Sequence, residues 1–393
     1  MRSATLTAIA FALVMLDGYD MLILSFVGPL VAEAFRLNAH QLGTLFAASF
    51  AGSMLGSLVF GAVADRFGRR WVLVGTMFAG GLATLACSQA SSWVFFAITR
   101  FVSGMALGGA LAAVIPLVAE SFDKAKRSGH VTAMFVGYPL GAVVGGAITT
   151  ALLQSGWRNP FIGAGVLTLV AAPAGLLFRE TLAMDRPKTT APGARQPGTL
   201  LQLFANGRAA PTLFAALGIF CLLCVAYLLN SWTPMLARSA GLGTRIAALS
   251  AVAINLGGVA GALLSIEFAR RFGLLRVMVI MFALGSVAVA ALGASFASPV
   301  ALLSAAFIAG VLIIGGQLNC PAAFVRLYPE SMRAAGVGLQ LTAGRFGSIV
   351  GPLAAGQLLT ARADGTFLYL AAGAACLVAA VCYALVGTHE PKA

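Results

Sequence analysis

Two aspartates stand three residues apart within a long apolar run near the start of the chain, in the sequence Asp17-Gly18-Tyr19-Asp20. Residues three apart on a helix share a face, so both carboxylates are expected on one side. Carboxylates at membrane depth are unfavourable unless they face water or a counter-charge. Repulsion between them and partial desolvation favour the protonated form of at least one, so we expect a proton-coupling pair. The alternative is a structural role, in which they are tied to Arg100 or to backbone at the helix mouth.

Two arginines, Arg100 and Arg345, also fall inside apolar runs. A guanidinium binds a carboxylate through two parallel hydrogen bonds and stays charged at every relevant pH. Each arginine is therefore a candidate anchor for an organic acid. The alternatives are a salt bridge from Arg100 to one of the aspartates and a packing contact for Arg345. The two roles of Arg100 are compatible, because a proton on an aspartate would release the arginine for a substrate.

Further side chains in the apolar runs are candidates for contact with an aryl ring or its polar substituents. Most aromatic residues in membrane spans serve packing or the interfacial belt, so at most two of the aromatic candidates are expected to bind substrate. Uncharged amides are better specificity candidates, because an amide in an apolar span requires a partner. The candidates are Tyr19, Phe50, Tyr138, Tyr227, Asn230, Trp232, Gln317 and Asn319.

The apolar runs define the class of protein. Of the 393 residues, 60% are hydrophobic and 9% are charged, whereas an ordinary soluble domain has about 25% charged residues. The runs are continuously apolar, which favours helices over the alternating strands of a membrane barrel. We expect an all-α membrane protein with twelve transmembrane helices. The predicted spans are 5–32, 40–63, 71–89, 93–119, 130–153, 159–178, 209–236, 246–268, 275–296, 299–325, 334–360 and 366–387.

The loops indicate the topology and the domain organisation. Of the 25 Lys and Arg residues, 18 lie on the side shared by both predicted termini and five on the opposite side. The positive-inside rule then places both termini in the cytoplasm. The polar, proline-containing stretch 179–208 is typical of a linker, here between bundles 1–178 and 209–393. A signal peptide at the first run is disfavoured, because the run is too long and contains two aspartates.

An internal repeat relates the two predicted bundles. The segment 64–68 (ADRFG) recurs at 269–273 (ARRFG), an offset of 205 residues, and the Gly-x-x-x-Gly pair at 141 and 145 recurs at 347 and 351, an offset of 206. Two matches at nearly one offset predict pseudo-symmetric six-helix halves, a construction of many secondary transporters. The glycine pairs predict close helix packing.

Three further motifs resemble those of the major facilitator superfamily. Residues 61–70 (GAVADRFGRR) resemble its signature in the loop between the second and third helices, with Val63 as the single departure. Residues 100–109 resemble the fourth-helix signature, and residues 328–336 resemble the loop between the tenth and eleventh helices. The resemblance implies a twelve-helix carrier that works by alternating access.

Within that superfamily, the motif at 17–20 resembles the signature of the aromatic acid:proton symporters, the carriers related to benzoate, 4-hydroxybenzoate and protocatechuate uptake. The likeness extends to Trp232-x-Pro234 and to residues 344–352 (GRFGSIVGP). It implies import of an aromatic carboxylate together with protons.

Charged residues at the loop motifs are candidates for a gate. Asp65 stands at a helix junction, where an acid can cap a helix N-terminus or pair with an arginine of the other half. Acid–base pairs occupy related positions in both halves, and we expect them to form a latch that breaks when the protein opens inward. The predicted gating residues are Asp65, Arg66, Arg69, Arg70, Glu120, Arg127, Glu330 and Arg333.

Several other functions are disfavoured by the sequence. There is no phosphate-binding Gly-x-x-x-x-Gly-Lys-[Ser/Thr] loop, and no His-Glu-x-x-His or Gly-x-Ser-x-Gly motif, so we expect neither ATP-driven transport nor an enzyme. The histidines at 40, 130 and 389 are far apart, and Cys221-x-x-Cys224 lacks a second ligand pair, so no metal or cofactor is expected. The basic residues lie in loops and do not indicate nucleic-acid binding.

We therefore expect a monomeric proton-coupled symporter of the bacterial inner membrane that imports an aromatic carboxylate by alternating access. Its partners would be a small organic anion, protons and the lipid bilayer. The alternatives are a carrier of another organic anion and a drug or metabolite exporter of the same fold. The two aspartates and the two arginines at membrane depth favour an anionic substrate over a lipophilic cation.

Overall fold

The computed structural model describes residues 3–388 except 123, 181–202, 206, 329–331 and 362–363. Most of the predicted linker, 179–208, lies outside the described residues. The chain divides into two compact units, Met1–Lys188 and Thr189–Ala393, and the division falls within that linker. All regular elements of the described residues are helices.

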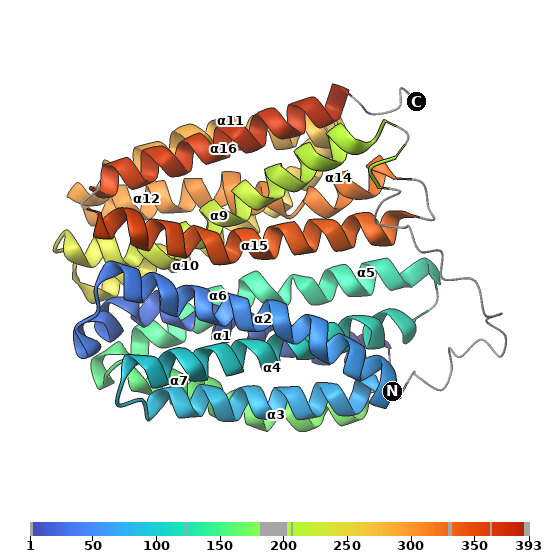
Figure 1. Ribbon diagram of the computed structural model, residues 1–393, viewed down its shortest axis with the longest axis horizontal. Coiled ribbons are helices and arrows are strands. Elements are labelled where there is room, and N and C mark those ends of the chain that lie inside the picture. The colour runs from blue at the N-terminus through green and yellow to red at the C-terminus, as the bar shows by residue number, and fades with distance from the viewer. Residues whose placement is uncertain are drawn as a thin grey trace. The chain divides into compact units, whose positions relative to one another are not determined.

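The first unit contains seven α-helices and two short 3-10 turns among its described residues (Figure 1). The helices are α1 (Ser3–Phe35), α2 (Ala39–Phe67), α3 (Arg69–Ser88), α4 (Trp93–Glu120), α5 (Lys124–Phe135), α6 (Gly137–Leu152) and α7 (Arg158–Ala171), and the turns are η1 (Leu153–Ser155) and η2 (Ala172–Leu177).

The second unit repeats this plan with more interruptions. Its helices are α9 (Ala209–Ser239), α10 (Gly243–Phe272), α11 (Leu274–Leu292), α12 (Pro299–Ala309), α13 (Gly315–Gln317), α14 (Cys320–Leu327), α15 (Arg333–Thr360) and α16 (Gly365–Thr388). A 3-10 turn, η3 (Ser295–Ala297), precedes α12, and a π-helical turn, η4 (Gly310–Ile314), follows it.

Eleven helical stretches of the described residues are long and apolar enough to cross a membrane. They correspond to the first ten predicted spans and the last. The predicted span 334–360 forms α15 but is not among the eleven, because glutamines, Arg345 and several glycines lower its hydropathy. Large apolar side chains are exposed on many helices, such as Val170 (73%) and Val300 (75%), as expected of a surface that faces lipid. The predicted all-α membrane fold is confirmed.

Two predicted spans are not the continuous helices expected from the sequence. The span 130–153 is divided into α5 and α6, and the span 299–325 contains a π turn and a break after α13. Each break has a proline four residues beyond the last helical residue: Pro139 follows Phe135, and Pro321 follows Gln317. A proline ring clashes with the carbonyl four residues earlier and offers no N–H, which favours a break at these two points.

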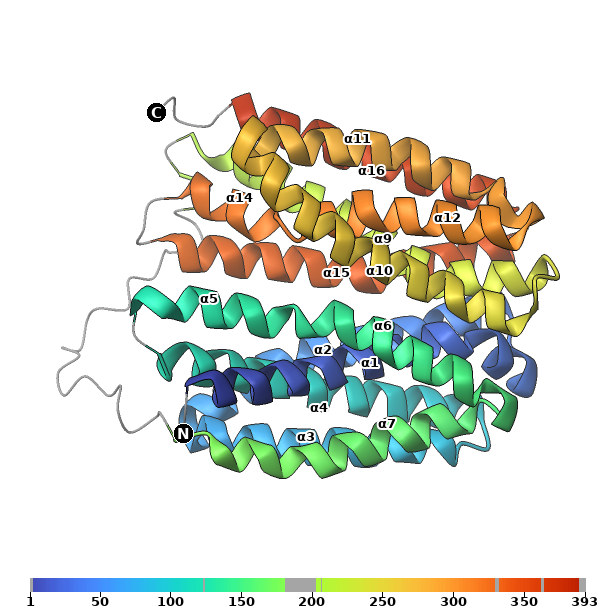
Figure 2. The same ribbon diagram turned by 180° about the vertical axis from the view of Figure 1, so that it is seen from behind.

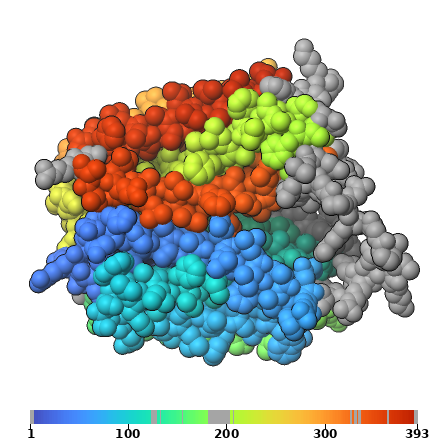
Figure 3. Space-filling view, in the orientation of Figure 1, coloured from blue at the N-terminus to red at the C-terminus, as the bar shows by residue number. Residues whose placement is uncertain are grey.

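Each unit shows the same helix pairing. In the first, α1 packs along α6, α2 along α4, and α3 against α4 and α7; in the second, α9 packs along α15, α10 against α12 and η4, and α11 against α16. Figure 2 shows α3 beside α7, and Figure 3 shows the outer surface that α9, α15 and α16 form. The repeated glycines make the close approaches, since a Cβ at Gly141 would collide with Met15 O and one at Gly351 with Cys224 O.

Candidate functional site

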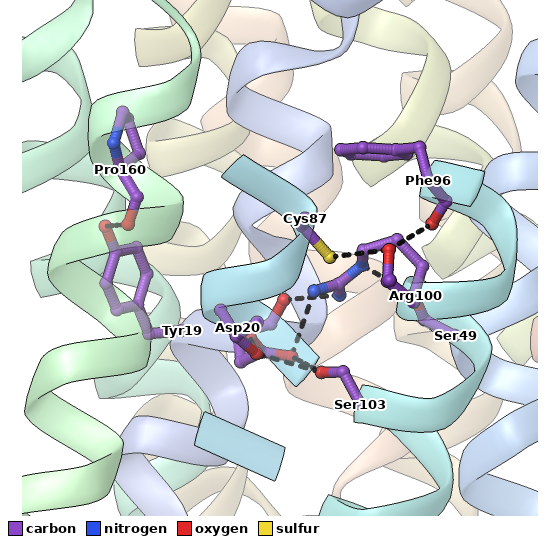
Figure 4. A network of polar contacts seen from close by, with 10 residues as sticks. Tyr19, Asp20, Ser49, Cys87, Phe96, Arg100, Ser103 and Pro160 are labelled. Carbon is purple, nitrogen blue, oxygen red and sulfur yellow. Dashed lines mark hydrogen bonds and ion pairs between the residues drawn. The ribbon is translucent and has the colours of Figure 1, made fainter. Parts of the chain in front are cut away.

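Asp20 and Arg100 form an ion pair inside the first unit. Nη1 of Arg100 lies 3.1 Å from Oδ2 of Asp20, and Nη2 donates to the main-chain oxygen of Asp20 at 2.7 Å. The Asp20 side chain is 1% exposed and the Arg100 side chain 0%. The pair joins the middle of α1 to α4 (Figure 4).

Hydroxyl groups from three helices complete the hydrogen bonding of this pair. Thr84 of α3 donates to Oδ1 of Asp20 at 2.5 Å, and Ser103 of α4 donates to Oδ2 at 2.9 Å. Nε of Arg100 donates to the hydroxyl of Ser49 in α2 at 3.0 Å. A buried charge is tolerated when it is paired and hydrogen-bonded in this way. Four helices of the first unit therefore meet at one polar network.

Arg100 forms a salt bridge to Asp20, which was the alternative to substrate contact in the sequence analysis. Its Nε, Nη1 and Nη2 all donate within the first unit. A substrate carboxylate would have to replace at least one of these acceptors. Substrate contact by Arg100 stays a prediction.

Four aromatic rings, which we name the aromatic cap, lie beside this network. Neighbouring ring centroids in the cap are 5.4 to 6.2 Å apart. The ring of Phe161 also lies 5.8 Å from Cζ of Arg100, a favourable distance for a cation above an aromatic face. The cap lies where α1 ends and where α4 and α7 begin. Its members are Phe35, Phe96, Trp157 and Phe161.

Asp17 lies one helical turn before Asp20 and is 3% exposed. It lines a narrow pocket between α1, α3 and α4. The other eight residues that line this pocket are apolar: Leu13, Val14, Leu73, Met77, Leu107, Ala110, Leu111 and Val114. Both aspartates thus face the interior of the first unit, and their proton-coupling role stays a prediction.

The aromatic candidates of the first unit have different surroundings. The hydroxyl of Tyr19 lies 3.1 Å from that of Thr149 and donates to Pro160 O at 3.4 Å, so it points away from Asp20 (Figure 4). Tyr138 is half-buried in the first turn of α6, and Phe50 is buried in α2. Contact of these three residues with a substrate stays a prediction.

Two predicted polar residues of the second unit are held by hydrogen bonds within it. Asn230 accepts a bond from Nδ2 of Asn255 at 2.6 Å, and both side chains are buried. Nε1 of Trp232 donates to Pro352 O at 3.1 Å. Asn255 was missed in the sequence, although it is an amide within the predicted span 246–268 and the criterion used for Asn230 applies to it equally.

The remaining candidates of the second unit lie on three helical elements and a turn. Asn319 donates to the hydroxyl of Ser265 at 2.9 Å. Oε1 of Gln317, at the end of α13, is buried and has no hydrogen-bonding partner among the residues that the structure describes. Tyr227 in α9 and Arg345 in α15 are half-buried. Their contact with a substrate stays a prediction.

The candidate gate of the first unit centres on Arg69. Its guanidinium forms ion pairs with Asp65, at 3.1 Å, and with Glu120. Asp65 is 66% exposed and pairs within its own unit. Arg66 and Arg70 lie over the rings of their neighbours Phe67 and Trp71. Glu330 lies outside the described residues, as do the side chains of Arg127 and Arg333, so the gate stays a prediction.

The N-terminus of α3 is capped by Glu180 rather than by Asp65, which was the capping candidate in the sequence. The Glu180 carboxylate accepts the main-chain N–H groups of Arg69 and Arg70, each at 3.1 Å. Gly68 has φ of 106°, and a Cβ there would lie 2.6 Å from Oε2 of Glu180. Glu180 lies two residues after the sixth predicted span, and this position was the only signal for it in the sequence.

These observations define a multi-pass, all-α membrane protein whose two units repeat one packing plan and whose first unit contains a buried ion-pair network. The sequence profile of the Major Facilitator Superfamily matches residues 9–273. The chain belongs to this superfamily.

Curated relatives and solved structures agree with this assignment. The 3-(3-hydroxy-phenyl)propionate transporter of Escherichia coli (strain K12) is 31% identical over 369 residues, which cover 93% of this chain and 89% of the relative. The 4-hydroxybenzoate transporter PcaK of Pseudomonas putida is 30% identical over 381 residues, 89% of this chain and 85% of the relative. The inward open xylose transporter XylE from E. coli has a TM-score of 0.77 and 16% identity, covering 100% of this chain and 97% of that one.

The resemblance to aromatic acid transporters is therefore confirmed. The protein is a membrane transporter, and the proteins it resembles are transporters rather than enzymes.

Proposed function

We propose that this transporter is a symporter that imports an aromatic carboxylate with protons by alternating access. We place it in the bacterial inner membrane as a monomer with both termini in the cytoplasm. The names of the relatives support the substrate class, since they carry 3-(3-hydroxy-phenyl)propionate and 4-hydroxybenzoate. The observation that carries the coupling is the buried pair of Asp20 and Arg100.

The coupling follows from the charge balance of that pair. When the carboxylate of Asp20 takes up a proton, the guanidinium of Arg100 loses its counter-charge while it stays buried. An uncompensated buried charge is unfavourable by several kcal/mol, on the order of 3–5 in measured cases. A substrate carboxylate that binds Arg100 restores the balance. Proton binding and anion binding therefore stabilise each other, and neither ion is favoured alone.

Uptake into proteoliposomes tests this function. Radiolabelled 4-hydroxybenzoate and benzoate are supplied with an inward proton gradient, without one, and with a protonophore. Accumulation that requires the gradient is the expected result. Equal uptake with and without the gradient would overturn proton coupling. Uptake of neither acid by a folded, reconstituted protein would overturn the substrate class and favour another organic anion or the exporter.

A further inference from the structure

The polar network of the first unit has different surroundings at its two ends. On one side lies the aromatic cap, formed by the last residue of α1 and by residues near the starts of α4 and α7. On the other side lies the Asp17 pocket. Its α1 residues, Leu13 and Val14, precede Asp17, and its α3 residues, Leu73 and Met77, lie in the first turns of that helix. Its α4 residues, from Leu107 to Val114, lie in the second half of α4.

The pocket and the cap thus lie on opposite sides of Asp20 along the bundle. Asp17 stands between them, about 4.5 Å along the helix axis from Asp20. The rings of the cap pack edge to face beside Arg100. The pocket lies against Asp17 on the side opposite the cap.

The size and the lining of the pocket restrict what can enter it. The space admits about one water molecule. An aromatic carboxylate is far larger and must therefore reach Arg100 elsewhere. The apolar walls keep water sparse, and an apolar constriction conducts only when it is wetted.

The charged groups near the pocket suit a proton route. Asp20 lies on α1 and Arg100 on α4, both beyond Asp17 as seen from the pocket. At the pocket's end of the unit, α3 begins with Arg69 and Arg70, and α4 ends with Glu120. Among the helices packed on α1, α5 places His130 against Thr7 at 2.8 Å, and α7 contributes Arg158, which lies beside Trp157 of the cap.

We propose that the coupled proton leaves through this pocket between α1, α3 and α4, separately from the substrate, and passes from Asp20 to Asp17 on its way to the side that the proposed topology makes cytoplasmic. Asp20 gives its proton to the Asp17 carboxylate and, as a carboxylate again, recovers Nη1 of Arg100. A water molecule in the pocket then takes the proton from Asp17 and leaves as hydronium. The proposal rests on the proposed proton coupling and assigns its route to the first unit alone.

Filling the pocket tests the route. Ala110→Leu places a larger side chain in the pocket, and Ala112→Leu, on the same helix outside the pocket, is the matched control. We expect Ala110→Leu to lower gradient-driven uptake of 4-hydroxybenzoate by about tenfold, because a blocked passage excludes water. Counterflow with equal pH on both sides needs no net proton release, so it should stay within about twofold of the unmodified protein and show that the variant is folded.

Three outcomes of this experiment are distinguishable. Gradient-driven uptake that is unchanged in Ala110→Leu would overturn the pocket route while leaving proton coupling intact. Absence of gradient-driven uptake in the unmodified protein would instead overturn the proposed function itself.

The third outcome is that Ala110→Leu loses counterflow as well. A second pair of variants then tests whether the proton uses the pocket. Leu111→Ala widens the pocket and should increase substrate-free proton leak, measured with a pH-sensitive dye inside the vesicles. Leu82→Ala, whose side chain is 49% exposed on α3, is the control. Equal leak in the two variants would overturn the route.

Discussion

Arg100 holds Asp20 at two points, one on the side chain and one on the main chain. Nη1 contacts the carboxylate at 3.1 Å, and Nη2 donates to the main-chain oxygen at 2.7 Å. The main-chain bond does not depend on the charge of the carboxylate. Protonation of Asp20 would therefore free one edge of the guanidinium while the other edge keeps it beside α1. In the proposed cycle, the anion site is built by a change in charge rather than by a movement of the arginine.

Asp20→Asn should abolish proton-driven accumulation of 4-hydroxybenzoate. The amide keeps the size of the carboxylate but removes the charge that changes in the cycle. Binding of 4-hydroxybenzoate to the variant should persist, because the neutral amide does not compete with the substrate carboxylate for Arg100. Calorimetric titration of the detergent-solubilised proteins measures this binding. Accumulation at the normal level in the variant would remove Asp20 from the coupling step.

Arg100→Lys separates the arginine's geometry from its charge. An ammonium group retains the charge but cannot reproduce the planar fork that spans the carboxylate and the main-chain oxygen. We expect the dissociation constant for 4-hydroxybenzoate to rise by about tenfold or more, equivalent to about 1.4 kcal/mol. Arg345→Lys is the informative comparison, because it is the other arginine predicted as an anchor. A loss of affinity in Arg345→Lys alone would place the anion in the second unit and leave Arg100 a structural residue.

Glu180→Gln should lower the stability of the protein more than Asp65→Asn does. Glu180 accepts two main-chain N–H groups at the start of α3, and its charge lies at the positive end of the helix dipole. Loss of such a cap is expected to lower the free energy of unfolding by about 0.5–2 kcal/mol. Asp65 forms an exposed pair, for which the expected change is about 0–1 kcal/mol. Thermal unfolding in detergent compares the two variants. The opposite order would return the capping role to Asp65.

The fold was largely predictable from the sequence, because membrane spans are determined by long apolar runs that need no knowledge of their neighbours. The exceptions have local causes. Pro139 and Pro321 are visible in the sequence, but the apolar runs continue past them. Hydropathy does not show that a proline lacks the main-chain N–H that a continuous helix needs. The outcome for α15 is the opposite. This helix forms at the expected position and with the expected length, but its sequence is less apolar than those of the other spans.

The site was predictable only as a set of candidates. The rule that a charge at membrane depth needs a partner selected Asp17, Asp20 and Arg100, and it left the salt bridge open as one alternative. Which aspartate pairs with the arginine depends on the rotation of α1 against α4, and no spacing within one helix contains that information. The partners of such charges are harder to find, since Thr84, Ser103 and Ser49 are common residues in any span. Glu180 shows the same limitation, because its partners are main-chain groups.

The hydrogen bond between Asn230 and Asn255 should contribute to stability as a pair. Each amide also donates to the carbonyl four residues earlier in its own helix, Ala226 O and Ala251 O, so each keeps one bond when the other is removed. We expect Asn230→Ala and Asn255→Ala to be non-additive, with a coupling energy of about 0.6 kcal/mol and no more than about 1.7, the range of such bonds between membrane helices. A double-mutant cycle of unfolding free energies measures this coupling energy.

Uptake assays on the same variants give a second readout. Loss of affinity for 4-hydroxybenzoate in Asn230→Ala, with normal affinity in Asn255→Ala, would show that Asn230 contacts the substrate directly. Equal effects in both would mean that the pair acts by joining α9 to α10, and additive stabilities would contradict the hydrogen bond itself.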